Sequence, residues 1–234
     1  MKRFSSIIAF SFSLCMLYGQ LPANLEMGSY KNLYDLLNNV PLYQFSFTVS
    51  KRTEFNIKMG GGNDYKVDSS FEQMQSAIYS KIFAVFDGEN LYINGKHING
   101  GQHYCLVENN QRYLILKAGI PGGLSRRKNL GYDDSMIQTD NIALGITTIG
   151  AAVRAAQLAV IRLYYIVDCK TGIIKILSKD YLISLLDDYP EIKEQFDLEK
   201  DNANLTVLLE YVKKINEKNN LITPIVEQSF VVPH

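Results

Sequence analysis

The chain has 234 residues, in which 24 Lys and Arg balance 24 Asp and Glu, with 15 Tyr, 11 Phe and no Trp. A balanced charge produces no strong field that would recruit nucleic acid, so we expect no nucleic-acid partner. The length suffices for one domain with a real core or for two small ones, and the aromatic content favours a sheet-rich protein.

The N-terminal residues have the pattern of a secretory signal peptide. Two basic residues precede an apolar run over 4–18, and small Gly19 stands at the expected cleavage site. Cys15 lies inside the apolar run, so we expect no lipid anchor. Removal of residues 1–20 takes away two basic residues and no acidic one, which leaves a net charge of about −2. We expect a periplasmic or extracellular protein, with outer-membrane association as an alternative.

The first half of the remaining chain predicts one short helix and an antiparallel meander. Residues 30–39 carry apolar side chains at helical spacing until Pro41 prevents continuation. Residues 43–52 alternate between apolar and polar, as in a half-buried strand. Residues 65–118 contain strand-like runs separated by Asn- and Gly-rich turns. These runs are YKV, AIYSKIFAVF, LYIN, HYCLVE and RYLILKA.

The glycine-rich GGGNDY motif at 60–65 is interpreted as a turn, because no helix N-terminus follows it to form an anion cradle. Residues 119–140 have little periodicity and are predicted to form a long loop.

An apolar segment follows, over 142–161, and is predicted to be a helix. Arg154 and Arg162 interrupt it, so a transmembrane span is not expected in the mature chain. Placed at 100° steps, both arginines fall opposite an apolar stripe, which gives the helix a wet side. The main interpretation lays this helix across the inner face of the sheet. The alternative is self-association or contact with a membrane surface through small residues, namely Ala151, Ala155 and Ala159.

The C-terminal part is predicted to be a hairpin followed by helices. LYYIVD, the turn CKTG and IIKIL form the hairpin. Helices begin after Ser178, and Pro190 is suited to the first turn of one of them. Residues 219–234 are predicted to be a C-terminal tail or an added edge strand.

Two cysteines remain after export, Cys105 and Cys169, in a compartment that permits disulfides. A disulfide between them would close a loop of about 64 residues and contribute on the order of 4 kcal/mol. The alternative is two separately buried thiols that pack as small apolar groups.

The candidate chemistry is limited to a cluster of His97, His103 and Cys105. His103 and Cys105 are two apart on a predicted strand, and so on one face. The spacing matches no closed zinc motif and shows no fourth ligand, so we predict no metal site and no cofactor. A Cys–His hydrolase is the third functional hypothesis, and no catalytic residue is assigned.

Several segments are informative through their order: GGGNDYKV, FAVFDGENLYING, RYLILKAGIP, the Gly- and Ala-rich helix, and LYYIVDCKTGIIKIL-x-K-DYL. In this order they resemble a domain-of-unknown-function family of uncharacterised exported bacterial proteins, Bacteroidetes-type, over residues 25–218. The resemblance implies export, an α+β body and a small-residue helix between two sheet sections. That family has no assigned active site, so no catalytic role is carried over.

We therefore predict a single α+β domain over 21–218, with an antiparallel meander sheet, a packed alanine- and glycine-rich helix and C-terminal helices. The first functional hypothesis is an exported, non-catalytic binding or scaffold protein whose partner is an envelope protein or a glycan. The second is an envelope-associated oligomer that uses the helix at 142–161.

Overall fold

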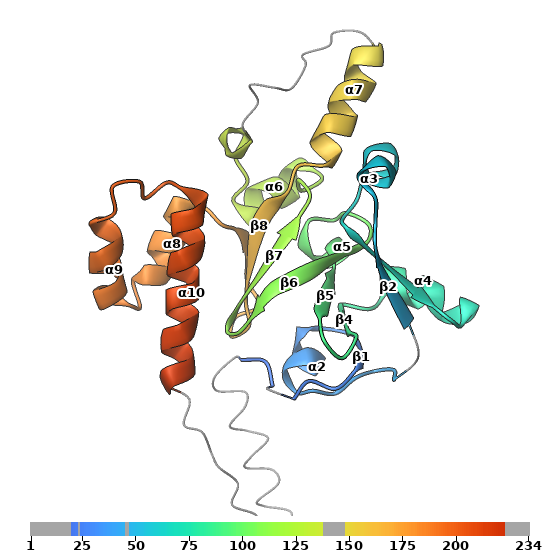
Figure 1. Cartoon of the computed structure of the whole chain (residues 1–234), viewed down its shortest axis with the longest axis horizontal. Coiled ribbons are helices and arrows are strands. Elements are labelled where there is room, and N and C mark those ends of the chain that lie inside the picture. The colour runs from blue at the N-terminus through green and yellow to red at the C-terminus, as the bar shows by residue number, and fades with distance from the viewer. Residues whose placement is uncertain (1–19, 23, 45–46, 138–147, 223–234) are drawn as a thin grey trace, which may run out of the picture.

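The computed structural model describes residues 20–22, 24–44, 47–137 and 148–222 and has an α+β fold (Figure 1). Within these residues nine strands form one antiparallel sheet. Its main path runs β1-β4-β5-β6-β7-β8-β9, while β3 pairs with β6 and carries β2. The strands are β1 (Gly28–Tyr30), β2 (Phe47–Lys51), β3 (Tyr65–Ser69), β4 (Ala84–Phe86), β5 (Leu91–Asn94), β6 (Tyr104–Asn110), β7 (Tyr113–Ala118), β8 (Leu163–Asp168) and β9 (Ile174–Ile176).

The helices are distributed around this sheet, with the last three grouped on one side of it (Figure 1). They are α2 (Leu33–Leu37), α3 (Glu54–Gly60), α4 (Glu72–Ser80), α5 (Gly95–Ile98), α6 (Leu124–Leu130), the 3-10 turn η1 (Asp134–Met136), α7 (Thr148–Ala159), α8 (Lys179–Leu186), α9 (Pro190–Asp197) and α10 (Leu205–Ile222).

Strand alternation divides the apolar side chains between the two faces of the sheet. Along β7, Leu114 and Leu116 enter a core shared with β5, β6, β8, α2 and α6. Tyr113 and Ile115 point to the opposite face and pack against α8, α9 and α10. A third core lies between β3, β4, β5, β6 and α4. Both faces of the β7–β8 pair are therefore covered.

The predicted fold class, the meander, the β8–β9 hairpin and the C-terminal helices are confirmed. Pro190 occupies the first turn of α9, as its missing N–H permits. Helix α10 continues to Ile222, and the remainder of the predicted tail lies outside the described residues.

Three local predictions are wrong. Tyr30 belongs to β1, so the N-terminal helix begins only at Leu33, where the Asn32 side chain caps it. Residues 77–80 end α4 and are not part of a strand. Ile78 enters the core from this helix, and Ile82 enters it from the segment that follows. The predicted loop at 119–140 contains α6, which ends at Gly131 in a left-handed conformation.

Helix α7 forms within the predicted segment, but it does not lie across the sheet. The side chains of residues 151–155 are exposed, and the helix contacts α3. Figure 1 shows α7 projecting from the body beside α3. The physical reason is that α6 and α8–α10 already cover the faces of β7 and β8. Residues 142–147 of the predicted helix lie outside the described residues.

No helix among the residues that the structure describes is long and apolar enough to cross a membrane.

Candidate functional site

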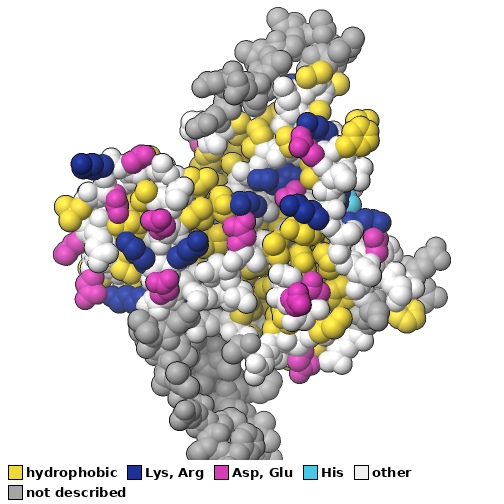
Figure 2. Space-filling view, viewed as in Figure 1, with side chains coloured by type: hydrophobic (Ala, Val, Ile, Leu, Met, Phe, Trp, Pro, Cys, Tyr) yellow, Lys and Arg dark blue, Asp and Glu magenta, His cyan; other side chains and the backbone are white. Residues whose placement is uncertain are grey.

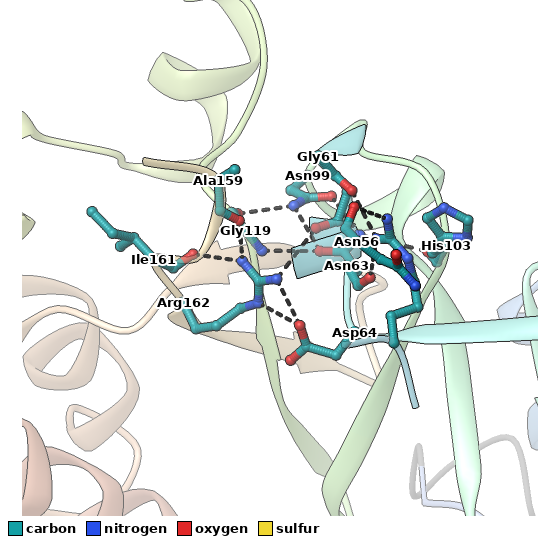
Figure 3. A network of polar contacts seen from close by, with 12 residues as sticks. Asn56, Gly61, Asn63, Asp64, Asn99, His103, Gly119, Ala159, Ile161 and Arg162 are labelled. Atoms are coloured by element: carbon teal, nitrogen blue, oxygen red, sulfur yellow. Dashed lines mark hydrogen bonds and ion pairs between the residues drawn. The ribbon is translucent and has the colours of Figure 1, made fainter. Parts of the chain in front are cut away.

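A buried polar cluster lies where the α3–β3 turn, the α5–β6 loop and the end of β7 meet (Figure 3). Asn63 is fully buried and Asn99 is 2% exposed. Asn63 Nδ2 donates to Asn99 Oδ1 (3.3 Å) and Gln102 O (3.1 Å), while its Oδ1 accepts from Gly119 N at 2.9 Å. Asn99 Nδ2 donates to Gly119 O at 2.9 Å. These four residues, called the Asn63 cluster below, join three segments that are distant in sequence.

Arg162 connects two residues that flank Asn63, Gly62 and Asp64, to the end of α7. Its Nε and Nη2 both donate to Asp64 Oδ1, at 2.8 and 2.6 Å. Its Nη1 donates to the carbonyl oxygens of Ala159 (2.8 Å) and Ile161 (2.9 Å), which satisfies backbone acceptors at the C-terminus of α7. The Arg162 side chain is only 13% exposed. The prediction that this arginine lies on a wet face of the helix is therefore wrong.

Arg52 performs the matching role for α3. Its Nη1 donates to the carbonyl oxygens of Gly61 and Asn63, both at 2.7 Å, and its Nη2 donates to Asn56 O at 2.9 Å. Burial, followed by the charge of Arg162, lowers the pKa of Arg52. Two guanidinium groups thus hold α3 and α7 at fixed positions next to the turn at 61–64.

These two helices expose several apolar side chains among charged ones, which are Glu54 and Lys58 on α3 and Arg154 on α7. On α3, Phe55 and Met59 are 69% and 75% exposed, and on α7 Val153 is 46% exposed. Ala151 and Ala155 are exposed beside Val153. Figure 2 shows hydrophobic side chains at this end of the molecule with charged side chains between them. We call these five apolar residues the α3–α7 surface. Of the predicted interface residues, Ala151 and Ala155 belong to it, whereas Ala159 is half-buried.

A pocket of about 530 Å³ lies at the α5–β6 loop. It is lined by Tyr79, Ser80, Lys96, Gly100, Gly101, Gln102 and His103. The rings of Tyr79 and His103 meet edge to face, with centroids 6.1 Å apart. Burial, followed by the charges of Arg52 and Lys66, lowers the pKa of His103 to about 4.

The structure does not bring the His97, His103 and Cys105 side chains together. His103 has φ 68° and precedes β6, so it shares no strand face with Cys105. His97 lies on α5 and packs its ring against Phe83. No group of three or more His, Cys, Asp or Glu side chains in the described part of the chain is placed to hold a metal ion.

Cys105 and Cys169 are both buried free thiols in the core that contains β5 to β8. Burial raises the pKa of the Cys105 thiol, and it raises that of Cys169 to about 12. A thiol must ionise to act as a nucleophile, so neither sulfur is placed for that role.

The turn at 60–65 was predicted from the sequence, but the residues that bond to it, Asn99, Gly119 and Arg162, were not. A turn interpretation accounts for Gly61 and Gly62, whose φ values are 63° and 81°. It gives no reason for Asn63 or Asp64. The available signal was two polar residues directly before strand β3, and the sequence alone connects them to no partner.

The fold and the site define an antiparallel α+β protein with a polar cluster that fixes two projecting helices. The chain belongs to a family of unknown function, DUF6563, whose model matches residues 28–219. The predicted resemblance to a domain-of-unknown-function family is thus confirmed at this level. Neither the curated proteins nor the solved structures contain a match to this chain.

Proposed function

We propose that this protein is an exported, non-catalytic binding or scaffold protein of the bacterial envelope, and that it contacts its partner through the α3–α7 surface. Export is supported by the pattern of residues 1–20, and Bacteroidetes-type membership by the resemblance described above. The observation that carries the proposal is the exposure of Phe55 and Met59 on a helix fixed by Arg52.

Single exposed apolar residues are common. Here Phe55 and Met59 lie one turn apart on α3, and α3 contacts α7, whose residues 151–155 are exposed. Grouped exposed apolar side chains are typical of interaction sites. Arg52 and Arg162 order the backbone on both sides of the surface, so less conformational entropy remains to be lost on binding. An ordered aromatic side chain with an adjacent methionine is typical of protein interfaces.

A Cys–His hydrolase receives no support from the residues that suggested it. The Cys105 thiol is buried with a raised pKa, and His103 faces the pocket and not this sulfur. Binding of a protein partner at the α3–α7 surface is therefore better supported than a reaction at Cys105 and His103.

Site-specific photo-crosslinking in envelope preparations tests the proposal. We expect Phe55→p-benzoylphenylalanine to give a discrete adduct. The same substitution at Leu198, which is 84% exposed at the end of α9, is the matched control and should give none. Met59→Ser should reduce the adduct at position 55 about fivefold, as expected for loss of an interface side chain worth roughly 1 kcal/mol. Equal labelling at both positions, or none at position 55, would contradict the proposal.

A second candidate, self-association, is favoured by the exposure of Ala151 and Ala155, which permit close helix approach. In that case the adduct would have twice the mass of the chain. Sedimentation would show a dimer that Ala155→Arg dissociates. A wild-type chain that sediments as a monomer at all concentrations would rule this candidate out. Flotation with anionic liposomes tests the membrane-surface alternative. If the surface contacts a membrane, the wild-type protein should float with the liposomes, and Ala155→Arg should float equally well.

The mass of the protein recovered from the envelope fraction tests export. We expect the N-terminus to lie next to Gln20. Recovery of the protein only with residues 1–20 still attached would contradict cleavage.

A further inference from the structure

The pocket beside His103 is separate from the α3–α7 surface and has its own chemistry. Its volume of about 530 Å³ lies within the range of small-molecule sites. Two aromatic rings, Tyr79 and His103, form part of its wall. Gly100, against which the Arg126 guanidinium lies, and Gly101 form another part. Such a wall suits a flat group that packs against rings.

The charges around this pocket are unbalanced in favour of cations. Among the described residues Lys96 forms no ion pair, although its side chain lines the pocket. Arg52, close enough to affect the His103 pKa, directs its hydrogen bonds to backbone carbonyls. Arg126 Nη1 likewise donates to the Lys96 carbonyl at 3.2 Å. Only Lys66 has an acidic partner here, Asp68 at 2.9 Å.

His103 adds a polar atom that the protein does not satisfy. Its Nδ1 is buried and has no hydrogen-bond partner. Because the His103 pKa is lowered, its ring is uncharged at neutral pH, so the positive charge available to a ligand comes from Lys96. The backbone at His103 is also held in the left-handed region, at φ 68°. Histidine, like Asn and Asp, adopts this conformation more readily than most residues.

We infer that this pocket binds a small organic anion, a carboxylate attached to a flat apolar ring. The ring would pack against Tyr79 and His103, and the carboxylate would pair with the Lys96 ammonium. The Ser80 hydroxyl already donates its proton to Ser76 O and is not assigned to the ligand. Recognition of the ligand is assigned to Lys96 and to the rings of Tyr79 and His103. The inference does not depend on the partner proposed for α3 and α7.

Benzoate is the probe that tests this inference, with benzamide and acetate as matched controls. Benzamide keeps the ring and removes the charge, while acetate keeps the charge and removes the ring. Titration of the purified protein, followed by amide chemical shifts, should show saturable benzoate binding with a Kd on the order of 1 mM or tighter. The shifts should concentrate at Lys96 and the 100–103 loop, and both controls should bind at least about fivefold more weakly.

Lys96→Gln identifies the cation, and Lys128→Gln on exposed α6 is its control. Because Lys96 is exposed, the fold should tolerate this change. We expect Lys96→Gln to weaken benzoate about fivefold and leave benzamide unchanged, whereas Lys128→Gln should alter neither.

Three results would overturn the inference: equal affinity for benzoate and benzamide, unchanged benzoate affinity in Lys96→Gln, or shifts located elsewhere. Absence of saturable binding at about tenfold above the expected Kd would also overturn it. None of these outcomes would affect the crosslinking result at Phe55, so failure of the two proposals can be distinguished.

Discussion

The buried polar cluster makes one quantitative prediction, for the variant Asn63→Ala. Truncation removes both ends of the Asn63 amide, which is fully buried. The energetic cost depends on which partners keep another bond. Gln102 O still accepts from the Asn63 backbone N–H at 2.8 Å, and Asn99 Nδ2 still donates to Gly119 O at 2.9 Å. These groups therefore remain satisfied.

Gly119 N–H is the exception, since Asn63 Oδ1 at 2.9 Å is the acceptor that the structure gives it. Leaving one buried donor unsatisfied costs about 1–3 kcal/mol, and the lost side-chain packing adds to this. We expect the free energy of unfolding to fall by about 3 kcal/mol.

Urea denaturation followed by circular dichroism would measure this change. The midpoint should fall while the slope with denaturant stays constant, because the surface exposed on unfolding hardly changes. Asn129→Ala is the matched control, as Asn129 is exposed on α6, and should stay within about 0.5 kcal/mol of wild type. A loss below about 1 kcal/mol in Asn63→Ala would refute the reasoning that the cluster holds these segments together.

The Arg162 ion pair, the His103 ring and the two buried thiols can each be tested in solution. Arg162→Met should lower the free energy of unfolding by about 2 kcal/mol in the same urea assay, because the Asp64 carboxylate loses its cationic partner at a poorly solvated position. The matched control is Arg154→Met at an exposed position, which should change the free energy of unfolding by less than about 0.5 kcal/mol. Since the His103 pKa is lowered from 6.5 to about 4, the unfolded chain takes up this proton first as the pH falls, so the free energy of unfolding should decrease between those pH values. His103→Asn, which tolerates positive φ, should show a smaller decrease, and an identical pH profile in both proteins would contradict the assignment. Neither Cys105 nor Cys169 should react with a thiol reagent until urea unfolds the chain, and rapid labelling of the native protein would contradict their burial.

Much of the fold was predictable because strands and helices have different apolar periods. Short apolar runs bounded by turn residues at 113–118 and 163–168 identified β7 and β8, and the spacing of apolar residues in α10 identified that helix. The errors occurred where local pattern is ambiguous. Residues 77–80 contain β-favouring side chains but form the end of α4, because Ile78 packs into the core from a helix.

The candidate site was predictable only in part. Ala151 and Ala155 were recognised as a surface suited to close contact, and the structure leaves both exposed. Phe55 and Met59 were not recognised, since α3 itself was not predicted. His103 was noted for the wrong reason, because its positive φ places it beside a pocket and away from Cys105. A backbone conformation of this kind has no reliable signature in a single sequence.

The sequence by itself determined the antiparallel meander, the β8–β9 hairpin, the C-terminal helices and the family to which the chain belongs. Tertiary structure alone decided the polar architecture. Asn63 and Asn99 are 36 residues apart in the chain, and Asp64 and Arg162 are 98 apart. Apolar burial follows a local period, but a hydrogen bond requires two particular atoms within about 3 Å, and only folding brings such distant atoms together.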